Sequence, residues 1–471
     1  MDLNKIENVY FIGIGGIGMS ALARYFLAIG KTVSGYDRTA TTLTSQISRE
    51  GVDVHFVEDI HLIPPRFFDN PDKTLVVYTP AVPKNHTELV YFRNNNFNVY
   101  KRSEVLGQIT REKFTIAVAG THGKTTISTM LAHILSSAGI GSTAFLGGIS
   151  KNFRSNMVID PNSEYMIVEA DEFDRSFLCL FPSVSIISSV DADHMDIYGT
   201  LDELQKAFCA FARQLKVRGR LIHKQGIQLT LNEDEDFIIF KYDIEKQANF
   251  YAKNIRVYNG VNYFDIVTPS LEIQNCSLGV SGKVNIENSV AAVAVAVLLG
   301  IGADSIRQAL RTYSGVKRRF DYQINLPDLV YIDDYAHHPE ELRATIDSVR
   351  DLYPDRKITA VFQPHLYSRT RDFADDFARE LSKVDKLFLL DIYPAREEPV
   401  PGVTSRLIFD KITDTDKILC SHEEMVNLVV NSELDILLTL GAGDIDTRVD
   451  YLKKMIMARY ESGDELEDEV T

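Results

Sequence analysis

Residues 115–126, "TIAVAGTHGKTT", combine the residue types that bind a polyphosphate. A strand-like apolar run leads into a short loop that carries glycines, a lysine and threonines. Backbone N–H groups of such a loop can point at phosphate oxygens, Lys124 can reach the β and γ phosphates, and Thr125 can offer its hydroxyl to Mg²⁺. Val118 stands where the strict GxxxxGK[ST] pattern has its first glycine, but each chemical role is still filled. The pattern predicts a nucleoside triphosphate site at Gly120, Thr121, His122, Gly123, Lys124, Thr125 and Thr126.

Residues 13–18, "GIGGIG", form a second glycine-rich loop between a strand-like and a helix-like segment. Gly13, Gly15 and Gly18 fit the GxGxxG pattern, and Asp37 follows 19 residues after Gly18. The glycines let the backbone approach a diphosphate, the helix N-terminus supplies N–H donors, and the acid can accept hydrogen bonds from a sugar hydroxyl. The loop alone is compatible with NAD, with a nucleotide diphospho-sugar, or with close packing and no ligand. Because a dehydrogenase has no use for Mg-ATP, the two loops together favour ATP-driven joining.

Acids and a histidine at strand ends could complete the triphosphate site. Glu169 directly follows the apolar run "YMIV", where a carboxylate can bind the Mg²⁺ that Thr125 contacts. Asp171 and Glu172 come soon after, and some of these acids could simply form a solvated loop. His194 lies among acids in "DADHMD", so it is a candidate metal ligand, although a lone histidine is more often structural.

A further group of charged residues lies in the last third of the chain. The segment 315–321, "GVKRRFD", could be a salt-bridged hinge, or its arginines could clamp phosphates. The segments "DDYAHHP" and "FQPHLYSRTRD" follow apolar strands, where α/β proteins place ligand groups. Zinc is disfavoured because adjacent histidines seldom ligate one ion and no cysteine is near. The candidates in these segments are Arg319, Asp334, His337, His338, His365 and Arg369.

Strand-like runs alternate with helical patterns along most of the chain, which is typical of βαβ units. We expect an α/β protein of three domains: an N-terminal Rossmann-like domain at 1–108, a central P-loop ATPase-type parallel sheet at 109–315, and a C-terminal Rossmann-like domain at 316–460. Short β segments at 249–278 are expected to form a side sheet, and the acidic stretch 461–471 is expected to be disordered.

Composition narrows the class of protein further. The chain has 471 residues, a net charge of −16 and four dispersed cysteines without a CxxC pair. This argues against nucleic acid as a partner and against a disulfide framework. The longest plain apolar run, 290–299, is shorter than the ~20 residues of a membrane helix. We expect a cytoplasmic monomer or weak homodimer with no membrane insertion.

Taken together, the motifs resemble the Mur ligase family over nearly the whole chain. The matching segments are "GIGGIGMS", "GTHGKTT", "EADEFDRSFL", "DADHMD", "GVKRRFD", "DDYAHHP", "FQPHLYSRTRD" and "GAGDI". The central loop is also shared with folylpolyglutamate synthases, whereas the N-terminal loop and the His-His-Pro segment narrow the choice. The order of the acidic motifs looks most like the branch that adds L-alanine to UDP-N-acetylmuramate.

The resemblance implies a role for each matching residue. UDP-N-acetylmuramate would bind at Gly13, Gly15, Gly16, Ile17, Gly18, Ser20 and Asp37. ATP would bind the central loop with Asn285, Asn288, Arg319 and Asp334, and two Mg²⁺ sites would involve Thr125, Glu169 and His194. The amino acid would meet His338, His365 and Arg369, and the catalytic residues would be Lys124, His194, Arg319, His337 and His338. Val284 replaces a histidine that is frequent in relatives, which weakens one adenine-side contact.

The implied reaction forms an amide in two steps. The lactyl carboxylate attacks the γ-phosphate of ATP to give an acyl phosphate, and the neutral amine of L-alanine then displaces phosphate. Three alternatives are a recycling ligase that adds a whole murein peptide to the same sugar nucleotide, an NAD-dependent dehydrogenase fused to a nucleotide-binding module, and a nucleotide sensor without turnover.

Overall fold

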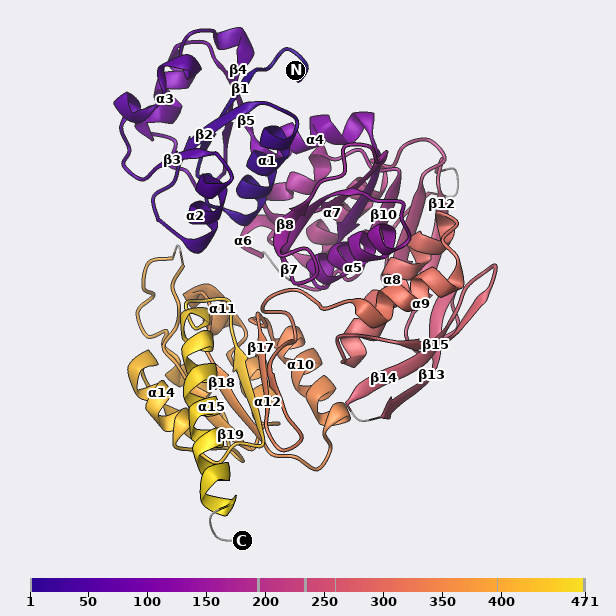
Figure 1. The fold of residues 1–471 in the computed structure, drawn as a ribbon, viewed down its shortest axis with the longest axis vertical. Helices are drawn as coiled ribbons and strands as arrows, with labels where there is room; N and C mark the ends of the chain where they lie inside the picture. Colours follow the sequence, from indigo (N-terminus) through magenta and orange to yellow (C-terminus); the bar gives the residue numbers. More distant parts are fainter. Residues whose placement is uncertain (1, 193–194, 233–234, 259, 396, 469–471) are drawn as a thin grey trace. The chain divides into compact units, whose positions relative to one another are not determined.

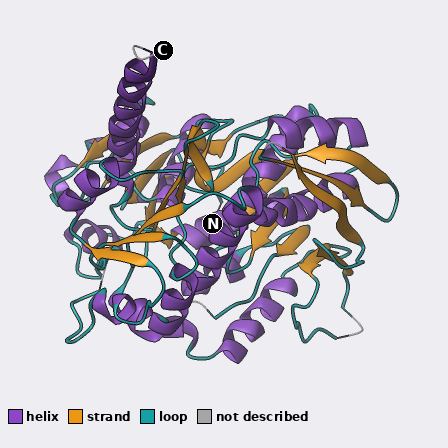
Figure 2. Ribbon diagram, turned by 90° about the horizontal axis from the view of Figure 1, so that it is seen from below, coloured by secondary structure: helices purple, strands orange, loops and turns teal. Residues whose placement is uncertain are grey.

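The computed structural model describes residues 2–192, 195–232, 235–258, 260–395 and 397–468 (Figure 1). Three β-sheets follow one another along the chain, and helices accompany the strands throughout (Figure 2). This confirms the predicted three-part α/β architecture. The alternation of strand and helix in the sequence produces it, because parallel strands need crossover connections.

The chain divides into two compact units rather than three. The first comprises 1–255, 264–277 and 287–314, and the second comprises 256–263, 278–286 and 315–471. The first sheet and most of the second therefore share one unit, while residues 256–263 of the second sheet and the whole third sheet belong to the other. The three domain boundaries expected from the sequence stay predictions.

The first sheet has five parallel strands in the order β3-β2-β1-β4-β5. Strand β1 pairs along its whole length with both neighbours, so the first glycine loop leaves from the middle of the sheet. The elements are β1 (Asn8–Ile12), α1 (Ile17–Ala28), β2 (Thr32–Tyr36), α2 (Thr42–Arg49), β3 (Asp53–His55), β4 (Thr74–Tyr78), α3 (Thr87–Asn94), β5 (Asn98–Lys101) and α4 (Arg102–Glu112).

The second sheet has ten strands in the order β15-β14-β13-β12-β11-β10-β6-β9-β7-β8. Its strands are β6 (Phe114–Ala119), β7 (Thr143–Ser150), β8 (Ser155–Val158), β9 (Tyr165–Glu169), β10 (Val184–Ile187), β11 (Arg220–Lys224), β12 (Ile238–Asp243), β13 (Phe250–Tyr258), β14 (Val261–Val267) and β15 (Glu272–Ser277). The helices here are α5 (Lys124–Ser137), α6 (Met195–Tyr198), α7 (Leu201–Ala212), α8 (Lys283–Leu298) and α9 (Ala303–Thr312).

The prediction of a separate side sheet at 249–278 is wrong. Strands β13, β14 and β15 extend the edge of the main sheet, because Tyr242 and Asp243 of β12 pair in parallel with Phe250 and Tyr251 of β13. This junction involves only two residue pairs, which is too short to leave a signal in the apolar pattern.

The third sheet has the order β16-β17-β21-β18-β19-β20, with β16 antiparallel to β17. Its strands are β16 (Asp321–Asn325), β17 (Val330–Asp334), β18 (Ile358–Phe362), β19 (Lys386–Leu389), β20 (Asp416–Leu419) and β21 (Ile436–Leu440). The helices are α10 (Pro339–Leu352), α11 (Tyr367–Asp372), α12 (Ala374–Leu381), α13 (Arg406–Phe409), α14 (His422–Val430) and α15 (Asp446–Asp468). Helix α10 begins at a favourable sequence, with proline at its first position and two glutamates in its first turn.

Helix α15 runs into the acidic stretch 461–471 as far as Asp468, whereas the sequence predicted disorder there. Within the described part of the chain, no helix combines the length and the apolar character needed to cross a bilayer.

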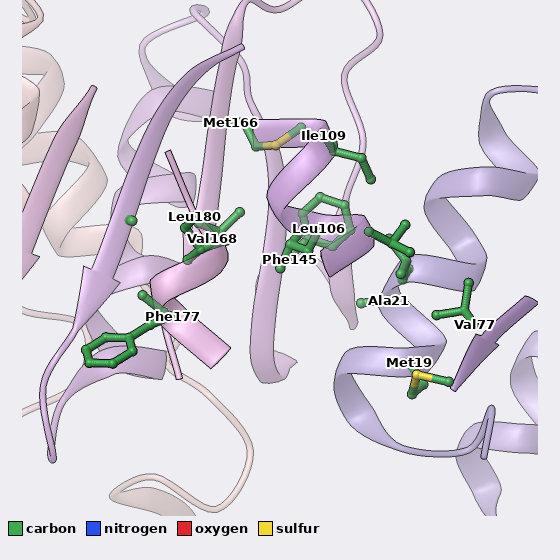
Figure 3. Close-up of a cluster of buried hydrophobic side chains, with 14 of the residues drawn as sticks. Met19, Ala21, Val77, Leu106, Ile109, Phe145, Met166, Val168, Phe177 and Leu180 are labelled. Atoms are coloured by element: carbon green, nitrogen blue, oxygen red, sulfur yellow. The ribbon is translucent and has the colours of Figure 1, made fainter. Parts of the chain in front are cut away.

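One hydrophobic cluster joins the first two sheets (Figure 3). Met19 and Ala21 from α1 and Leu106 from α4 belong to it together with Phe145 of β7 and Val168 of β9. All five side chains are nearly or fully buried. Because apolar burial is the main stabilising term in folding, this shared core fixes the first glycine loop relative to the central sheet.

Candidate functional site

The second glycine loop, residues 120–123, leaves the carboxyl end of β6 between its neighbours β9 and β10. Gly120 has φ +133° and Gly123 has φ +83°, values that L side chains rarely adopt. A Cβ atom on Gly120 would lie 2.2 Å from Ser188 Oγ and 2.8 Å from the backbone nitrogen of Ser189. Glycine is therefore required at 120 for both conformation and space.

The end of β10 holds this loop in shape. The backbone N–H groups of Thr121 and His122 donate to the backbone oxygen and the hydroxyl of Ser189, at 3.2 and 2.8 Å. The hydroxyls of Thr121 and Ser189 lie 2.9 Å apart, and Asp191 N–H donates to Thr121 Oγ1 at 3.1 Å. These contacts preorganise the loop.

Lys124, the first residue of α5, is paired inside the protein. Its ammonium donates to both carboxylate oxygens of Glu172, at 2.9 and 2.8 Å, and to the backbone oxygen of Gly120 at 2.7 Å. Burial acts to lower the pKa of Lys124, but the carboxylates of Glu172, Asp171 and Glu169 outweigh it and hold that pKa above its usual value. The lysine is therefore a permanent cation at the loop.

Thr125 and Glu169 form a pair suited to a magnesium ion. Thr125 Oγ1 donates to Glu169 Oε2 at 2.8 Å, and the same oxygen accepts the N–H of Gly147 at 3.0 Å. Two oxygens bound at right angles to one Mg²⁺ at ~2.1 Å lie about 3 Å apart, so the pair fits adjacent ligand positions. Among the described residues no three histidine, cysteine or carboxylate side chains gather as a metal cluster, and a Mg²⁺ site of this kind does not need one. His194 lies outside the described residues.

The two predicted adenine-side asparagines fall in different units. Asn288 lies beside the loop, because a Cβ atom on Gly123 would come within 2.7 Å of its Oδ1. Asn285 belongs to the second unit, where its amide donates to the backbone oxygen of Ser281. Thr126 is buried, and its backbone oxygen accepts a hydrogen bond from Tyr313 at 3.4 Å.

The first glycine loop, residues 13–18, is closed by Asp37. One carboxylate oxygen of Asp37 accepts the N–H of Gly15 at 2.7 Å, and the other accepts the N–H of Thr39 at 3.0 Å. Gly13 follows β1 with φ +87°, and a Cβ there would lie 2.7 Å from Thr79 Cγ2. Asp37 thus binds the loop backbone, in addition to any ligand role.

Ser20 is fully buried and faces the protein interior. Its hydroxyl donates to the backbone oxygen of Ile17 and accepts a hydrogen bond from Asn156 of β8 at 3.0 Å. Asn156 also donates to the backbone oxygen of Ile17 and accepts from Arg24. The Ser20 side chain therefore supports the loop from within the protein, and its assignment to the sugar nucleotide stays a prediction.

A pocket of about 250 Å³ in the first unit is lined both by the first glycine loop and by Glu169, the partner of Thr125. One wall is formed by the first glycine loop, at Gly16 and Gly18, together with the Arg102 side chain. The lining also includes Glu169 and Asp171. A ligand held by the first loop can therefore extend toward the carboxylate that pairs with Thr125.

Arg319 and Asp334 lie in the second unit near the end of β17. Asp334 is buried and accepts the backbone N–H groups of Phe320 and Ala336, at 2.7 and 2.8 Å. Burial raises the pKa of Asp334 to about 6, although the nearby Arg319 opposes the shift. The Arg319 guanidinium lies 3.7 Å from Glu341 and over the ring of Tyr335.

The histidines predicted for the amino-acid site share this sheet edge but differ in exposure. The rings of His337 and His365 meet edge to face, with centroids 5.6 Å apart. His338 is buried, and its Nδ1 accepts the N–H of Glu340 as the cap of α10. Arg369 is also buried, on α11. The second unit thus brings His337 and His365 together beyond the ends of β17 and β18, with Arg319 over the neighbouring Tyr335 ring and His338 in a capping role.

Several residues at the site carried no clear signal in the sequence. Glu172 was grouped with acids that could be solvated, yet its side chain is 1% exposed. Arg102 was not singled out, although its guanidinium lies against Gly18. At Gly147 a Cβ would come within 2.1 Å of Glu169 Oε2. Glycine is therefore needed there because the Glu169 carboxylate lies so close, and this contact is visible only in the tertiary structure.

Comparison with known proteins matches three family models in order along the chain. The Mur ligase family catalytic domain matches 8–114, the Mur ligase middle domain matches 118–296, and the Mur ligase glutamate ligase domain matches 318–443. A UDP-N-acetylmuramate–L-alanine ligase of Parabacteroides distasonis is 51% identical over 456 residues, which cover 97% of this chain and 98% of the relative.

Two solved structures resemble the fold over nearly its full length. The UDP-N-acetylmuramate–alanine ligase of Thermotoga maritima superimposes with a TM-score of 0.78 at 26% identity, covering 97% of this chain and 99% of that one. A murein peptide ligase of Psychrobacter arcticus superimposes with a TM-score of 0.67 at 22% identity, covering 96% and 98%. The second likeness concerns the fold alone.

Proposed function

Because this chain belongs to the Mur ligase family, we propose that it joins L-alanine to the lactyl carboxylate of UDP-N-acetylmuramate in peptidoglycan precursor synthesis. ATP is converted to ADP and phosphate, and the carboxylate passes through an acyl phosphate. The observation that carries the proposal is the pocket that runs from the first glycine loop to Glu169, beside the phosphate loop.

The first glycine loop and Arg102 hold the diphosphate of the sugar nucleotide. Gly16 and Gly18 leave the backbone at the start of α1 uncovered by side chains of their own. The N–H groups and the helix dipole there favour an anion. Arg102 is the cation on this wall of the pocket, and guanidinium suits phosphate oxygens. The lactyl carboxylate then extends along the pocket toward the other loop.

The second loop holds the phosphates of ATP. Lys124 places a fixed positive charge at the loop, which offsets repulsion between the incoming carboxylate and the γ-phosphate. Asn288 lies against Gly123 and is assigned to the adenine side of the nucleotide.

Thr125 and Glu169 would hold one Mg²⁺, and His194 is assigned to a second. Bound Mg²⁺ would neutralise charge on the phosphate oxygens as the carboxylate attacks. Gly147 keeps the Glu169 carboxylate aimed at Thr125 by donating its N–H to the same oxygen.

The second unit supplies the groups for the amino acid and the remaining phosphate contacts. Arg319 is assigned to the phosphates and Asp334 to the ribose, while His337, His338, His365 and Arg369 are assigned to the amino acid and the reacting groups. The nucleophile has to be the neutral amine, so a base must accept one proton, and the imidazoles of this group can do so.

Phosphate release tests the function directly. The purified chain receives UDP-N-acetylmuramate, ATP and Mg²⁺ with either L-alanine or a murein tripeptide, and NADH absorbance is followed in parallel. Release that depends on L-alanine supports the proposal. Release that depends on the tripeptide indicates the recycling ligase, a change in NADH absorbance indicates a dehydrogenase, and nucleotide binding without release indicates a sensor.

A further inference from the structure

The lysine of this phosphate loop is not solvent-exposed: Lys124 forms a buried ion pair with Glu172. The two side chains meet through both carboxylate oxygens, and their exposed fractions are 14% and 1%. Glu172 is therefore out of reach of bulk water, and a carboxylate buried this deeply needs its partner. Lys124 cannot swing away to a distant phosphate without leaving that carboxylate uncompensated.

The backbone around Glu172 is held firmly in an unusual turn. Tyr198 donates to the backbone oxygen of Glu172 at 2.6 Å, and the N–H of Arg175 donates to the same oxygen at 3.0 Å. Asp174 and Arg175 both adopt the left-handed region, with φ 52° and 54°. Two consecutive non-glycine residues in this region are strained, and such strain persists where the surroundings or function require it.

The hydrogen bonds of Lys124 leave one N–H that can change partner. Two of its three donors are engaged by Glu172, and the third points at the backbone oxygen of Gly120, inside the phosphate loop itself. That third donor can turn to a phosphate oxygen in the loop while the other two remain on Glu172.

We propose that Glu172 is a positioning residue for the ligase reaction: it holds the Lys124 ammonium at the phosphate loop so that one N–H is free to turn from Gly120 to the transferred phosphate. This proposal rests on the proposed function. Glu172 acts through Lys124 and need not touch either substrate.

Kinetics of Glu172→Gln test the proposal. A neutral amide offers Lys124 one acceptor and repels it with its own N–H donors, so we expect kcat to fall about ten- to a hundredfold. The KM for ATP and the Kd for ADP should stay within about threefold of the wild type, because the lost interaction matters only as charge develops. Asp174→Asn is the matched control: Asp174 lies on the same turn, pairs with Lys101 at the surface, and asparagine tolerates its left-handed backbone.

A double-mutant cycle with Lys124→Met separates positioning from a general structural role. If Glu172 acts through Lys124, adding Glu172→Gln to Lys124→Met lowers kcat by less than about twofold further. An additive loss, or a single Glu172→Gln variant with wild-type kcat, would overturn the proposal.

A crystal structure of nucleotide-free Glu172→Gln gives a readout that does not depend on turnover. We expect the Lys124 ammonium to leave the backbone oxygen of Gly120. If it remains bonded there, the positioning role is wrong even where the ligase activity is confirmed. If the wild type releases no phosphate with any acceptor while the ammonium does move, the proposed function fails and the positioning role stands.

Discussion

The two glycine loops of the first unit both bring the backbone close to a ligand site, but different atoms crowd around their glycines. The second loop, residues 120–123, is confined at the end of β10 by backbone atoms as well as by a side chain: a Cβ on Gly120 would lie 2.2 Å from Ser188 Oγ and 2.8 Å from the backbone nitrogen of Ser189. The first loop, residues 13–18, is confined by side chains: a Cβ on Gly13, Gly15 or Gly18 would meet Thr79, Asp37 or Arg102.

This difference explains why the second loop identified its ligand class and the first did not. A loop that is held partly by backbone atoms and leads directly into Lys124 and Thr125 presents donors that suit a triphosphate. A loop confined by side chains takes its specificity from those side chains, which come from elsewhere in the chain. Arg102, from α4, is one of them.

The largest effect in this comparison is expected at the second loop. Replacing Lys124 with alanine removes the fixed cation, and loss of one such group costs about 10³-fold in rate. Phosphate release in the presence of L-alanine measures it. Lys84→Ala, at an exposed lysine of the same unit, is the control. A Lys124→Ala rate within about tenfold of the wild type would contradict the assigned role.

Gly120→Ala tests whether the second loop is confined by the backbone. The positive φ alone costs roughly 1–3 kcal/mol, and the contacts with Ser188 Oγ and Ser189 N add to it. We expect a lower melting temperature and weaker ADP binding by calorimetry. Gly139→Ala is the matched control, because Gly139 has φ +73° and nothing lies within 4 Å of its Cβ position. Equal destabilisation by the two variants would show that crowding plays no part.

Arg102→Ala tests whether the first loop depends on a side chain from outside it. A hydrogen bond to a charged group contributes about 1.5–3 kcal/mol, so the KM for UDP-N-acetylmuramate should rise roughly ten- to a hundredfold. The affinity for ADP should not change, because Arg102 lies against the first loop and ADP is assigned to the second loop. Arg49→Ala, at an exposed arginine of α2, serves as the control. The idea fails if the KM for the sugar nucleotide is unaffected.

The smallest effect is expected at Gly16. This residue has φ −64°, and the atom nearest to its Cβ position is 3.8 Å away, so alanine fits without strain. Gly16→Ala should change the free energy of unfolding by less than about 0.5 kcal/mol, measured by thermal unfolding. Gly18→Ala should behave as a weaker Arg102→Ala, because its Cβ would push on Nη1 of Arg102. A large defect in Gly16→Ala would show that the first loop is also confined by its backbone.

The fold class could be predicted from the sequence because each sheet is built from apolar runs separated by helical patterns. The elements around both glycine loops were predicted for the same reason: β1 and β6 are short apolar strands, and a glycine directly follows each of them. The junction between β12 and β13 could not be predicted, because two residue pairs decide it.

Part of the site could also be read from residue type and spacing. Glu169 at the end of an apolar strand was a metal candidate, and the structure places it 2.8 Å from Thr125. By contrast, Ser20 lies in a loop motif but faces inward to Asn156, 136 residues away. Spacing indicates which residues lie near a loop, but it does not indicate the direction in which each side chain points.

By itself, the sequence determined the alternation of strands and helices, the two glycine loops and the charged groups that follow the strands. These are local properties, set by backbone conformation and by side-chain chemistry over a few residues. Only the tertiary structure decided that Glu172 is buried on Lys124 and that Arg102 covers Gly18. Those pairings join segments 48 and 84 residues apart, and packing of distant segments around a common core is what brings them together.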